Sequence, residues 1–258
     1  MIAAAAMTAL LGGAIPAIAQ ADAGEVPKTT LDLRDQGGLL EGSAFTDIGR
    51  IDFDVDYALA QAYTVGYLMN GKRIEWSIDL GGEQTLTLEG RDLKTGAVSK
   101  MEERDKAAFD QLLYAFELYR HKLDAIEDPA NKEAVRILVK TSELLSTYGV
   151  GLDLEGQTRI DSARAITSLC SAVGTWRNAY WDANGTNKVK AFVVGGHGVC
   201  KGHCGGGCPS GDREYTQDCL NHDACVGEEG ACAACPVGVC GDEWWAASDD
   251  YVSAPSCD

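Results

Sequence analysis

The sequence predicts an α+β protein in which an N-terminal domain of strands and paired helices precedes a small, disulfide-rich helical module. An early stretch alternates apolar and acidic residues, two amphipathic helical segments follow it, and nine of the ten cysteines lie between residues 200 and 257. A period of two is typical of strands, and an apolar period of about 3.6 is typical of helices. We expect a domain at residues 22–150, a connector with a short helix at 151–190 and the module at 191–258.

The first 21 residues are apolar and uncharged, and they end in small-residue sites of the A-x-A type at residues 17–19 and 19–21. This pattern indicates a signal peptide at residues 1–21. An uncleaved anchor is the alternative, because no Lys or Arg precedes the apolar run. No later stretch reaches the ~18 apolar residues that a membrane span needs. We therefore expect no transmembrane segment in the mature chain and a secreted or periplasmic location.

The chain is strongly acidic, with 22 Lys and Arg against 39 Asp and Glu and a net charge of −17. This charge repels nucleic-acid phosphate and discourages docking on anionic lipid. We expect no nucleic-acid partner, and the sequence identifies no protein partner. The cysteine density is typical of a disulfide-stapled module in an oxidising compartment.

The first half of the chain carries strand patterns. Residues 51–57 alternate Ile, Phe and Val with Asp, which predicts a half-buried strand whose carboxylates face water. A hairpin is expected next, joined through Gly81-Gly82. Its two arms carry Ile74, Trp76 and Ile78, then Leu86 and Leu88.

Two helices should follow the strands and pack as a hairpin. Residues 99–102 read Ser-Lys-Met-Glu, which has the form of a capping box, and apolar residues then recur at helical spacing until Pro129. A second helix is expected at about residues 131–148, ending at Gly149. His121 lies on the polar side of the first helix, so we expect it at the surface.

The connector contains a short helical pattern at residues 162–173, and Trp176, Tyr180 and Trp181 are expected to dock it on a neighbouring element. Residues 182–187 place a glycine at the fourth position, where an EF-hand loop needs it at the sixth. A turn is the better interpretation of that segment.

The module combines a glycine run with a His-Asp pair. Residues 204–208 read Cys-Gly-Gly-Gly-Cys, and glycine lets backbone carbonyls turn toward one point, which suits Ca²⁺. A carboxylate must complete such a site, and Asp223 lies on a predicted helix at about residues 215–226. Its neighbour His222 is a candidate general base.

Residues 219–225, Cys-Leu-Asn-His-Asp-Ala-Cys, resemble the Cys-Cys-x-x-His-Asp-x-Cys active-site helix of secreted phospholipases A2. Residues 204–207 are similar to the Cys-Gly-x-Gly calcium loop of the same family and precede the His-Asp pair at nearly the family's spacing. The resemblance covers about residues 197–250. It also implies two disulfides, Cys204 with Cys219 and Cys225 with Cys240.

The resemblance implies a calcium-dependent hydrolase that releases the sn-2 fatty acid from a glycerophospholipid, so a phospholipid or membrane interface is the expected substrate. His222 would take a proton from the attacking water. Asp223 and the backbone carbonyls of His203, Gly205 and Gly207 would hold the Ca²⁺. The ion and the Gly205 N–H would stabilise the oxyanion.

The chain departs from the family's pattern at three places, one of which is Ala247, where the partner of the doublet's first cysteine is expected. The first cysteine of the doublet is Asp218 here, and Gly241 stands where a second acid normally orients the histidine. Asp242, one residue later, is therefore the candidate for that catalytic role, with Asp249 and Asp250 as alternatives.

Other interpretations of the module stay open. It could be a non-catalytic, disulfide-stapled binding module in which His222 caps a helix. Zinc could be held by Cys200, His203, Cys204 and Cys208, or by Cys232 and Cys235, although disulfide formation competes in an exported chain. Trp244 and Trp245 are expected to fill a core rather than insert into lipid.

Overall fold

The computed structural model describes residues 29–58, 61–81, 85–159, 167–196, 200–205, 214–233, 235–254 and 257. The predicted signal peptide at residues 1–21 lies outside these ranges. No helix in the described ranges is long and apolar enough to cross a membrane.

The N-terminal half is built on a seven-stranded antiparallel sheet whose spatial order follows the chain. Its strands are β1 (Thr30–Asp35), β2 (Leu39–Thr46), β3 (Gly49–Asp56), β4 (Ala62–Met69), β5 (Lys72–Asp79), β6 (Thr85–Asp92) and β7 (Glu155–Arg159). Alternation in β3 buries Ile51, Phe53 and Val55, which confirms the predicted strand. The predicted hairpin is β5–β6, in which Trp76 pairs with Leu88 and Ile78 with Leu86.

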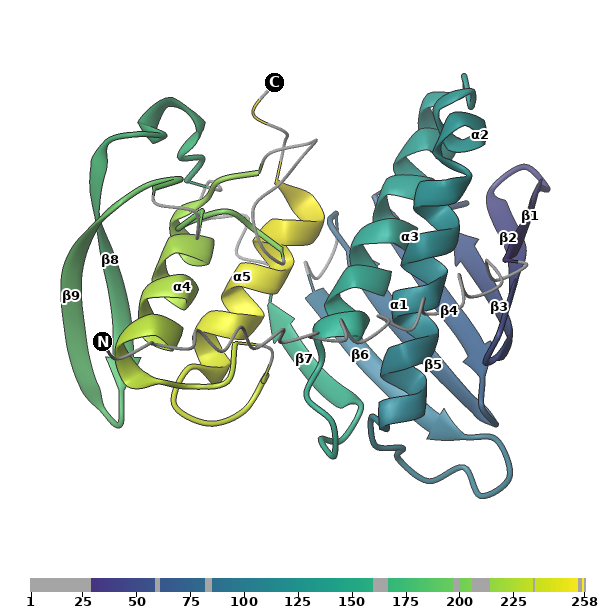
Figure 1. Cartoon of the computed structure of the whole chain (residues 1–258), viewed down its shortest axis with the longest axis horizontal. Helices are drawn as coiled ribbons and strands as arrows, with labels where there is room; N and C mark the ends of the chain where they lie inside the picture. Colours follow the sequence, from purple (N-terminus) through teal and green to yellow (C-terminus); the bar gives the residue numbers. More distant parts are fainter. Residues whose placement is uncertain are drawn as a thin grey trace, which may run out of the picture.

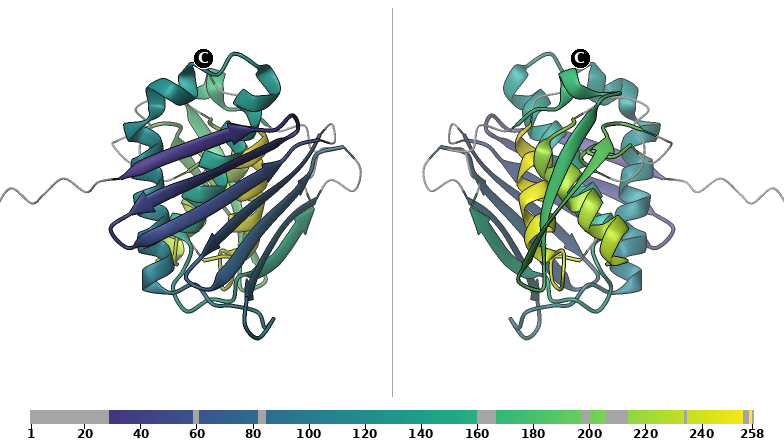
Figure 2. Two further views of the ribbon diagram at one scale, coloured as in Figure 1. Left: turned by 90° about the vertical axis from the view of Figure 1, so that its right-hand side faces the viewer. Right: turned by 90° about the vertical axis from the view of Figure 1, so that its left-hand side faces the viewer.

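Helices α1 (Glu103–Leu118), α2 (Arg120–Asp124) and α3 (Pro129–Thr147) cover one face of the sheet (Figures 1 and 2). The expected pairing of two long helices is confirmed by the packing of α1 against α3. His121 is exposed on α2, as predicted.

The capping box of α1 begins later than the sequence predicts. Glu102 is the N-cap, and its partner at N3 is Asp105. Ser99 does not cap the helix, because its backbone is part of the sheet edge. Its N–H donates a hydrogen bond to the Gly90 carbonyl, and its carbonyl accepts one from the Leu154 N–H. Asp105 is fully buried, with Lys72 Nζ 2.6 Å from its carboxylate.

The expected connector is more structured than its sequence indicates. Residues 155–159 form β7, which pairs with β6 and completes the sheet. Of the predicted helix at residues 162–173, residues 162–166 lie outside the described ranges, and residues 170–172 form only a 3₁₀ turn. A hairpin of β8 (Trp176–Ala183) and β9 (Thr186–Val193) follows, and Asn184 and Gly185 turn it with φ angles of 54° and 77°. The expected turn is therefore confirmed.

Strand alternation in β8 corrects the prediction that its aromatic residues all dock. Trp181 is buried, but Trp176 and Tyr180 point outward and are 67% and 55% exposed.

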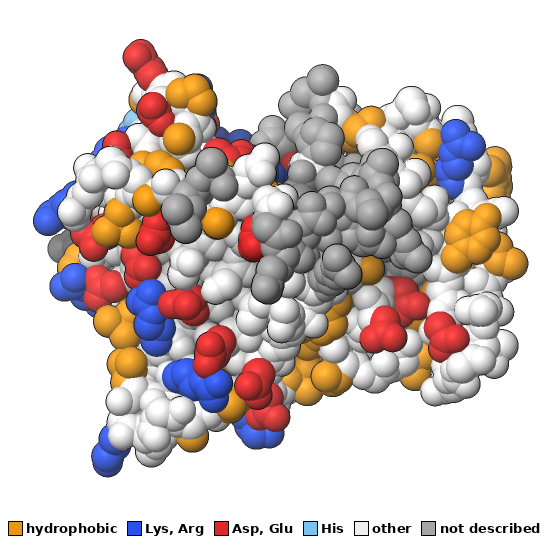
Figure 3. All heavy atoms as spheres, turned by 180° about the vertical axis from the view of Figure 1, so that it is seen from behind, with side chains coloured by type: hydrophobic (Ala, Val, Ile, Leu, Met, Phe, Trp, Pro, Cys, Tyr) orange, Lys and Arg blue, Asp and Glu red, His pale blue; other side chains and the backbone are white. Residues whose placement is uncertain are grey.

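On the face seen in Figure 3, acidic and basic side chains lie interspersed over the N-terminal domain instead of forming a patch of one sign.

The module contains α4 (Gln217–Glu229) and α5 (Gly241–Ser253), and α4 lies between the β8–β9 hairpin and α5 (Figure 1). Disulfides Cys204–Cys219 and Cys225–Cys240 confirm the pairing implied by the family resemblance. Cys170–Cys257 and Cys232–Cys235 also form among the described cysteines. These bonds are compatible with an oxidising, extracytoplasmic compartment.

The module shares its core with the N-terminal domain. Trp244 packs edge-on against Tyr148 with ring centroids 5.8 Å apart, and Trp245 packs against Trp76 at 6.3 Å. Both tryptophans therefore fill a core, as predicted. Because these contacts join α5 to α3 and the sheet, the two halves form one packed unit rather than a domain with a detachable module.

Candidate active site

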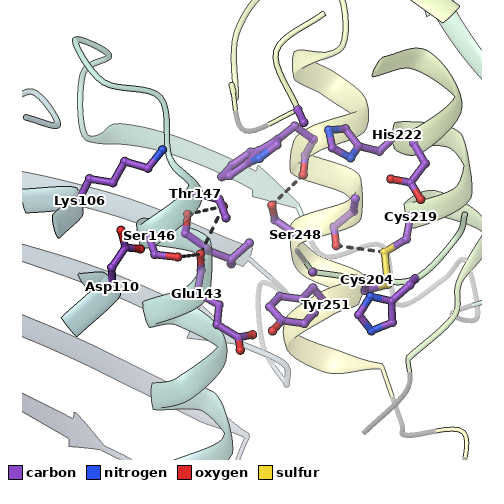
Figure 4. Close-up of a pocket in the computed structure, with 17 residues that line it drawn as sticks. Lys106, Asp110, Glu143, Ser146, Thr147, Cys204, Cys219, His222, Ser248 and Tyr251 are labelled. Carbon is purple, nitrogen blue, oxygen red and sulfur yellow. Dashed lines mark hydrogen bonds between the residues drawn. A yellow bond between two sulfur atoms is a disulfide. The ribbon is translucent and has the colours of Figure 1, made fainter. Parts of the chain in front are cut away.

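A cavity of about 510 Å³ opens between the N-terminal helices and the module (Figure 4). Helices α1 and α3 form one wall, and α4, α5 and residues 203–205 form the other. It is lined by Lys106, Asp110, Glu143, Leu144, Ser146, Thr147, His203, Cys204, Gly205, Cys219, His222, Asp223, Ala233, Trp244, Ala247, Ser248 and Tyr251. The structure thus brings four of the predicted site residues, His203, Gly205, His222 and Asp223, to one pocket.

His222 and Asp223 lie on helix α4, which is capped at both ends. The Thr216 side chain caps its N-terminus by accepting the Cys219 N–H, and Gly230 ends it in the left-handed conformation. Adjacent helical residues point about 100° apart. Asp223 therefore cannot orient its neighbour His222, and each side chain reaches the pocket separately.

The imidazole of His222 is held neutral by its surroundings. Burial lowers its pKa to about 4, and the nearby ammonium of Lys201 acts in the same direction. A contact with the Ala233 backbone acts in the opposite direction and raises this pKa. The buried Nε2 of His222 has no hydrogen-bond partner in the described part of the chain. One nitrogen of the neutral ring is thus left to accept a proton.

The carboxylate of Asp223 is bound to the backbone just before the glycine run. Its Oδ2 accepts the Gly202 N–H at 2.8 Å, and Lys201 Nζ donates to its backbone carbonyl at 2.7 Å. Burial raises the pKa of Asp223 to about 6 despite that hydrogen bond. Removal from water disfavours the charged carboxylate, and the nearby ammonium of Lys201 offsets part of that effect.

The loop at residues 203–205 adds backbone groups to the same pocket. Gly205 has a φ of +99°, and a Cβ there would lie 3.0 Å from the Tyr251 ring, so only glycine fits. His203 forms an antiparallel bridge with Tyr215, flanked by hydrogen bonds from Cys204 N and Thr216 N. This register turns the His203 carbonyl away from residues 214–216.

The donors fit Ca²⁺ better than zinc. No cluster of three or more His, Cys, Asp or Glu side chains suited to a metal occurs in the described ranges. A cation here would rest on the Asp223 carboxylate and on carbonyls, which are hard oxygen donors. Gly207, the remaining predicted ligand, lies outside the described residues. The zinc alternatives fail for Cys200, Cys204, Cys232 and Cys235, because all four are in disulfides and offer no thiolate.

The structure does not bring Asp242 to the pocket. Asp242 is exposed in the first turn of α5, whereas that helix lines the pocket through Trp244, Ala247, Ser248 and Tyr251. Two residues along a helix correspond to a rotation of about 200°, so Asp242 and Trp244 lie on opposite faces.

The two alternative acids, Asp249 and Asp250, are also absent from the pocket lining in the described structure. Burial raises the pKa of Asp250 to about 6, and the Thr216 side chain and the Asp218 backbone beside it lower that pKa in part. Asp250 therefore lies beside the start of α4.

The N-terminal wall of the pocket was not predicted. Glu143, Ser146 and Thr147 from α3 and Lys106 and Asp110 from α1 face the His222 side (Figure 4). Their spacing of three and four residues marks polar stripes on the two helices, which the sequence alone does not distinguish from a solvated face.

No protein-family model, curated protein or solved structure significantly matches this chain.

Replacing Glu143 by glutamine should stabilise the protein above neutral pH. Burial raises the pKa of Glu143 to about 7 from an ordinary value of 4.5. The folded state thus keeps a proton that the unfolded state loses, and wild-type stability falls as the pH rises from 4.5 to 7. Glutamine cannot ionise, so Glu143→Gln should gain about 1–3 kcal/mol at pH 8 relative to its difference at pH 4.5.

Urea unfolding at the two pH values measures this difference. Glu127→Gln, in the exposed segment before α3, is the matched control and should show no comparable change. A Glu143→Gln stability difference that is equal at both pH values would contradict the burial of this carboxyl.

Proposed function

We propose that this chain is an exported, calcium-dependent lipid-ester hydrolase that releases the sn-2 fatty acid from glycerophospholipids, as secreted phospholipases A2 do. The observation that carries the proposal is the convergence of His222, Asp223 and Gly205 on one cavity. The cavity of about 510 Å³ is of a size that holds part of a lipid molecule.

His222 supplies the base in the proposed reaction. A water molecule attacks the ester carbonyl while the open nitrogen of the neutral imidazole accepts its proton. The imidazolium then returns that proton to the departing alcohol oxygen as the tetrahedral intermediate collapses. The lowered pKa of His222 keeps the imidazole in its proton-accepting form down to acidic pH.

Asp223 and the carbonyls of His203, Gly205 and Gly207 are the groups that would hold the Ca²⁺. When bound, the cation supplies positive charge against the oxyanion that develops on the ester carbonyl oxygen. The chain's own contribution at that point is the Gly205 N–H, which can donate to the same oxygen. The apolar side chains of Leu144 and Trp244 line the cavity beside these groups and limit the access of bulk water.

A calcium titration by calorimetry tests the ligand assignment. The wild-type chain should bind Ca²⁺ stoichiometrically, and Asp223→Asn should bind it at least about 10-fold more weakly, because the carboxylate among the proposed ligands loses its charge. Glu228→Gln, at the outer surface of α4, is the matched control. If Asp223→Asn binds Ca²⁺ as the wild type does, the calcium assignment is wrong and the pocket is better explained as a non-catalytic binding site.

A further inference from the structure

Two oppositely charged side chains on the N-terminal wall of the cavity do not pair with each other. Lys106 and Asp110 of α1 both line the cavity, and neither side chain forms a hydrogen bond or an ion pair in the described part of the chain. They are four residues apart on the helix, a spacing at which opposite charges can pair. Lys106 instead points across the cavity toward the wall that carries His222 (Figure 4). Both charges are therefore available to a ligand in the cavity.

The two side chains differ in their exposure to water. Lys106 is half-buried and extends its ammonium toward the His222 side, whereas Asp110 is exposed at the rim of the cavity. A cation thus faces the interior of the cavity, and an anion lies one helical turn nearer to solvent. Glu143, the other acid on this wall, points toward the Tyr251 side of the cavity (Figure 4).

The hydroxyl groups on the same wall present acceptors to the cavity. Ser146 donates its proton to the Glu143 carbonyl, and Thr147 donates to the carbonyls of Glu143 and Leu144. With their protons used within α3, the two oxygens offer only lone pairs to a ligand. Together with the carboxylate of Asp110, they favour a positively charged group over a second anion on this wall.

We propose that Lys106 and Asp110 form a head-group subsite that selects zwitterionic phospholipids, in which Lys106 pairs with the phosphate and Asp110 with the ammonium group. This assignment rests on the proposed function, because it takes the substrate to be a glycerophospholipid whose sn-2 ester lies at His222. The order of groups in such a lipid is ester, phosphate and then ammonium. The cavity offers their counterparts in the same order, from His222 through Lys106 to the exposed Asp110.

The spacing of the two charges also suits this ligand. Residues four apart on a helix lie about one turn, ~5.4 Å, from each other along its axis. The phosphate and ammonium of a choline or ethanolamine head group are joined through only two carbons, so one head group can reach both side chains. An anionic head group that lacks the ammonium leaves Asp110 facing negative charge, which disfavours its binding.

Binding of short-chain, ether-linked phospholipids tests the subsite without hydrolysis. Two probes are compared below their micelle-forming concentrations, one with a phosphocholine and one with a phosphoglycerol head group. The wild-type chain should bind the phosphocholine probe about 2- to 5-fold more tightly, the range expected for one exposed ion pair. Asp110→Asn should remove this preference by weakening the phosphocholine probe alone, so the phosphoglycerol probe is the control within the same variant.

Lys106→Met should weaken both probes by about 10-fold, because both contain the phosphate that the ammonium binds. Lys106→Arg keeps the positive charge and should retain most of the affinity. Arg104→Met is the matched control, since Arg104 is exposed and lies about 200° around α1 from Lys106. Titration calorimetry with Ca²⁺ and with a chelator should rank these variants in the same order.

The binding results and the hydrolase assay have separable outcomes. If the wild type shows this pattern of binding but releases no fatty acid from ester-linked lipid, the subsite stands and the proposed function fails. If the wild type hydrolyses lipid but binds the two probes equally, or if Lys106→Met binds both as the wild type does, the head-group subsite is wrong.

Discussion

His222→Gln should lower kcat for fatty-acid release by about 10²–10⁴-fold, the contribution of a positioned general base. Glutamine keeps a similar shape in the pocket but cannot accept the proton of the attacking water. Calcium affinity should stay within about two-fold of the wild type, because Asp223 and the loop carbonyls are untouched. Initial rates on phosphatidylcholine vesicles, together with a calcium titration, measure both quantities.

The control for this substitution is His121→Gln, which changes an exposed histidine on α2 that does not line the pocket. It should retain wild-type activity. Retention of more than half of the wild-type kcat by His222→Gln would remove this histidine from the mechanism.

Lys140→Met should destabilise the protein by about 3–5 kcal/mol, the usual cost of leaving one partner of a buried ion pair without its counter-charge. Lys140 on α3 is buried and lies 2.8 Å from the buried carboxylate of Glu214. Its ammonium also donates to the Tyr251 carbonyl at 2.6 Å, so it joins α3 to both the loop before α4 and the end of α5. Urea unfolding measures the loss.

A double-mutant cycle separates the ion pair from general disruption of packing. Lys140→Met/Glu214→Gln should recover part of the stability that Lys140→Met loses, because no buried charge is left unpaired. Lys100→Met breaks the exposed Lys100–Asp153 pair and should cost at most about 1 kcal/mol. If the variants at Lys140 and Lys100 lose equal stability, the buried pair is not what joins the two halves.

The elements that the sequence predicts well are those whose pattern is local. The alternation in β3 and the arms of β5–β6 report directly which side of each strand is buried. The spacing of apolar residues likewise places α3 at Pro129–Thr147, close to the expected 131–148. The two cystines that tie α4 to its neighbours follow from the family resemblance.

The parts that the sequence does not predict depend on contacts between distant segments. Strand β7 is a short polar segment, Glu-Gly-Gln-Thr-Arg, that pairs with β6 across more than 60 residues of chain. Glu143 lines the same pocket as His222 because α5 packs against the end of α3, where Trp244 contacts Tyr148.

The family resemblance assigns the orientation of His222 to Asp242. The face of α5 that meets α4 is instead set by Trp244, Ala247 and Tyr251, which are buried. The burial of these apolar side chains sets the rotation of α5 about its axis, and Asp242 therefore lies on the exposed face.

The most direct test of the proposal uses the wild-type mature chain and phosphatidylcholine that carries a labelled fatty acid at the sn-2 position. With millimolar Ca²⁺ the label should appear as free fatty acid, and with a chelator in place of Ca²⁺ it should remain in the phospholipid. Label that stays in the phospholipid under both conditions, or that is released equally with and without Ca²⁺, would contradict a calcium-dependent hydrolase built on His222 and Asp223.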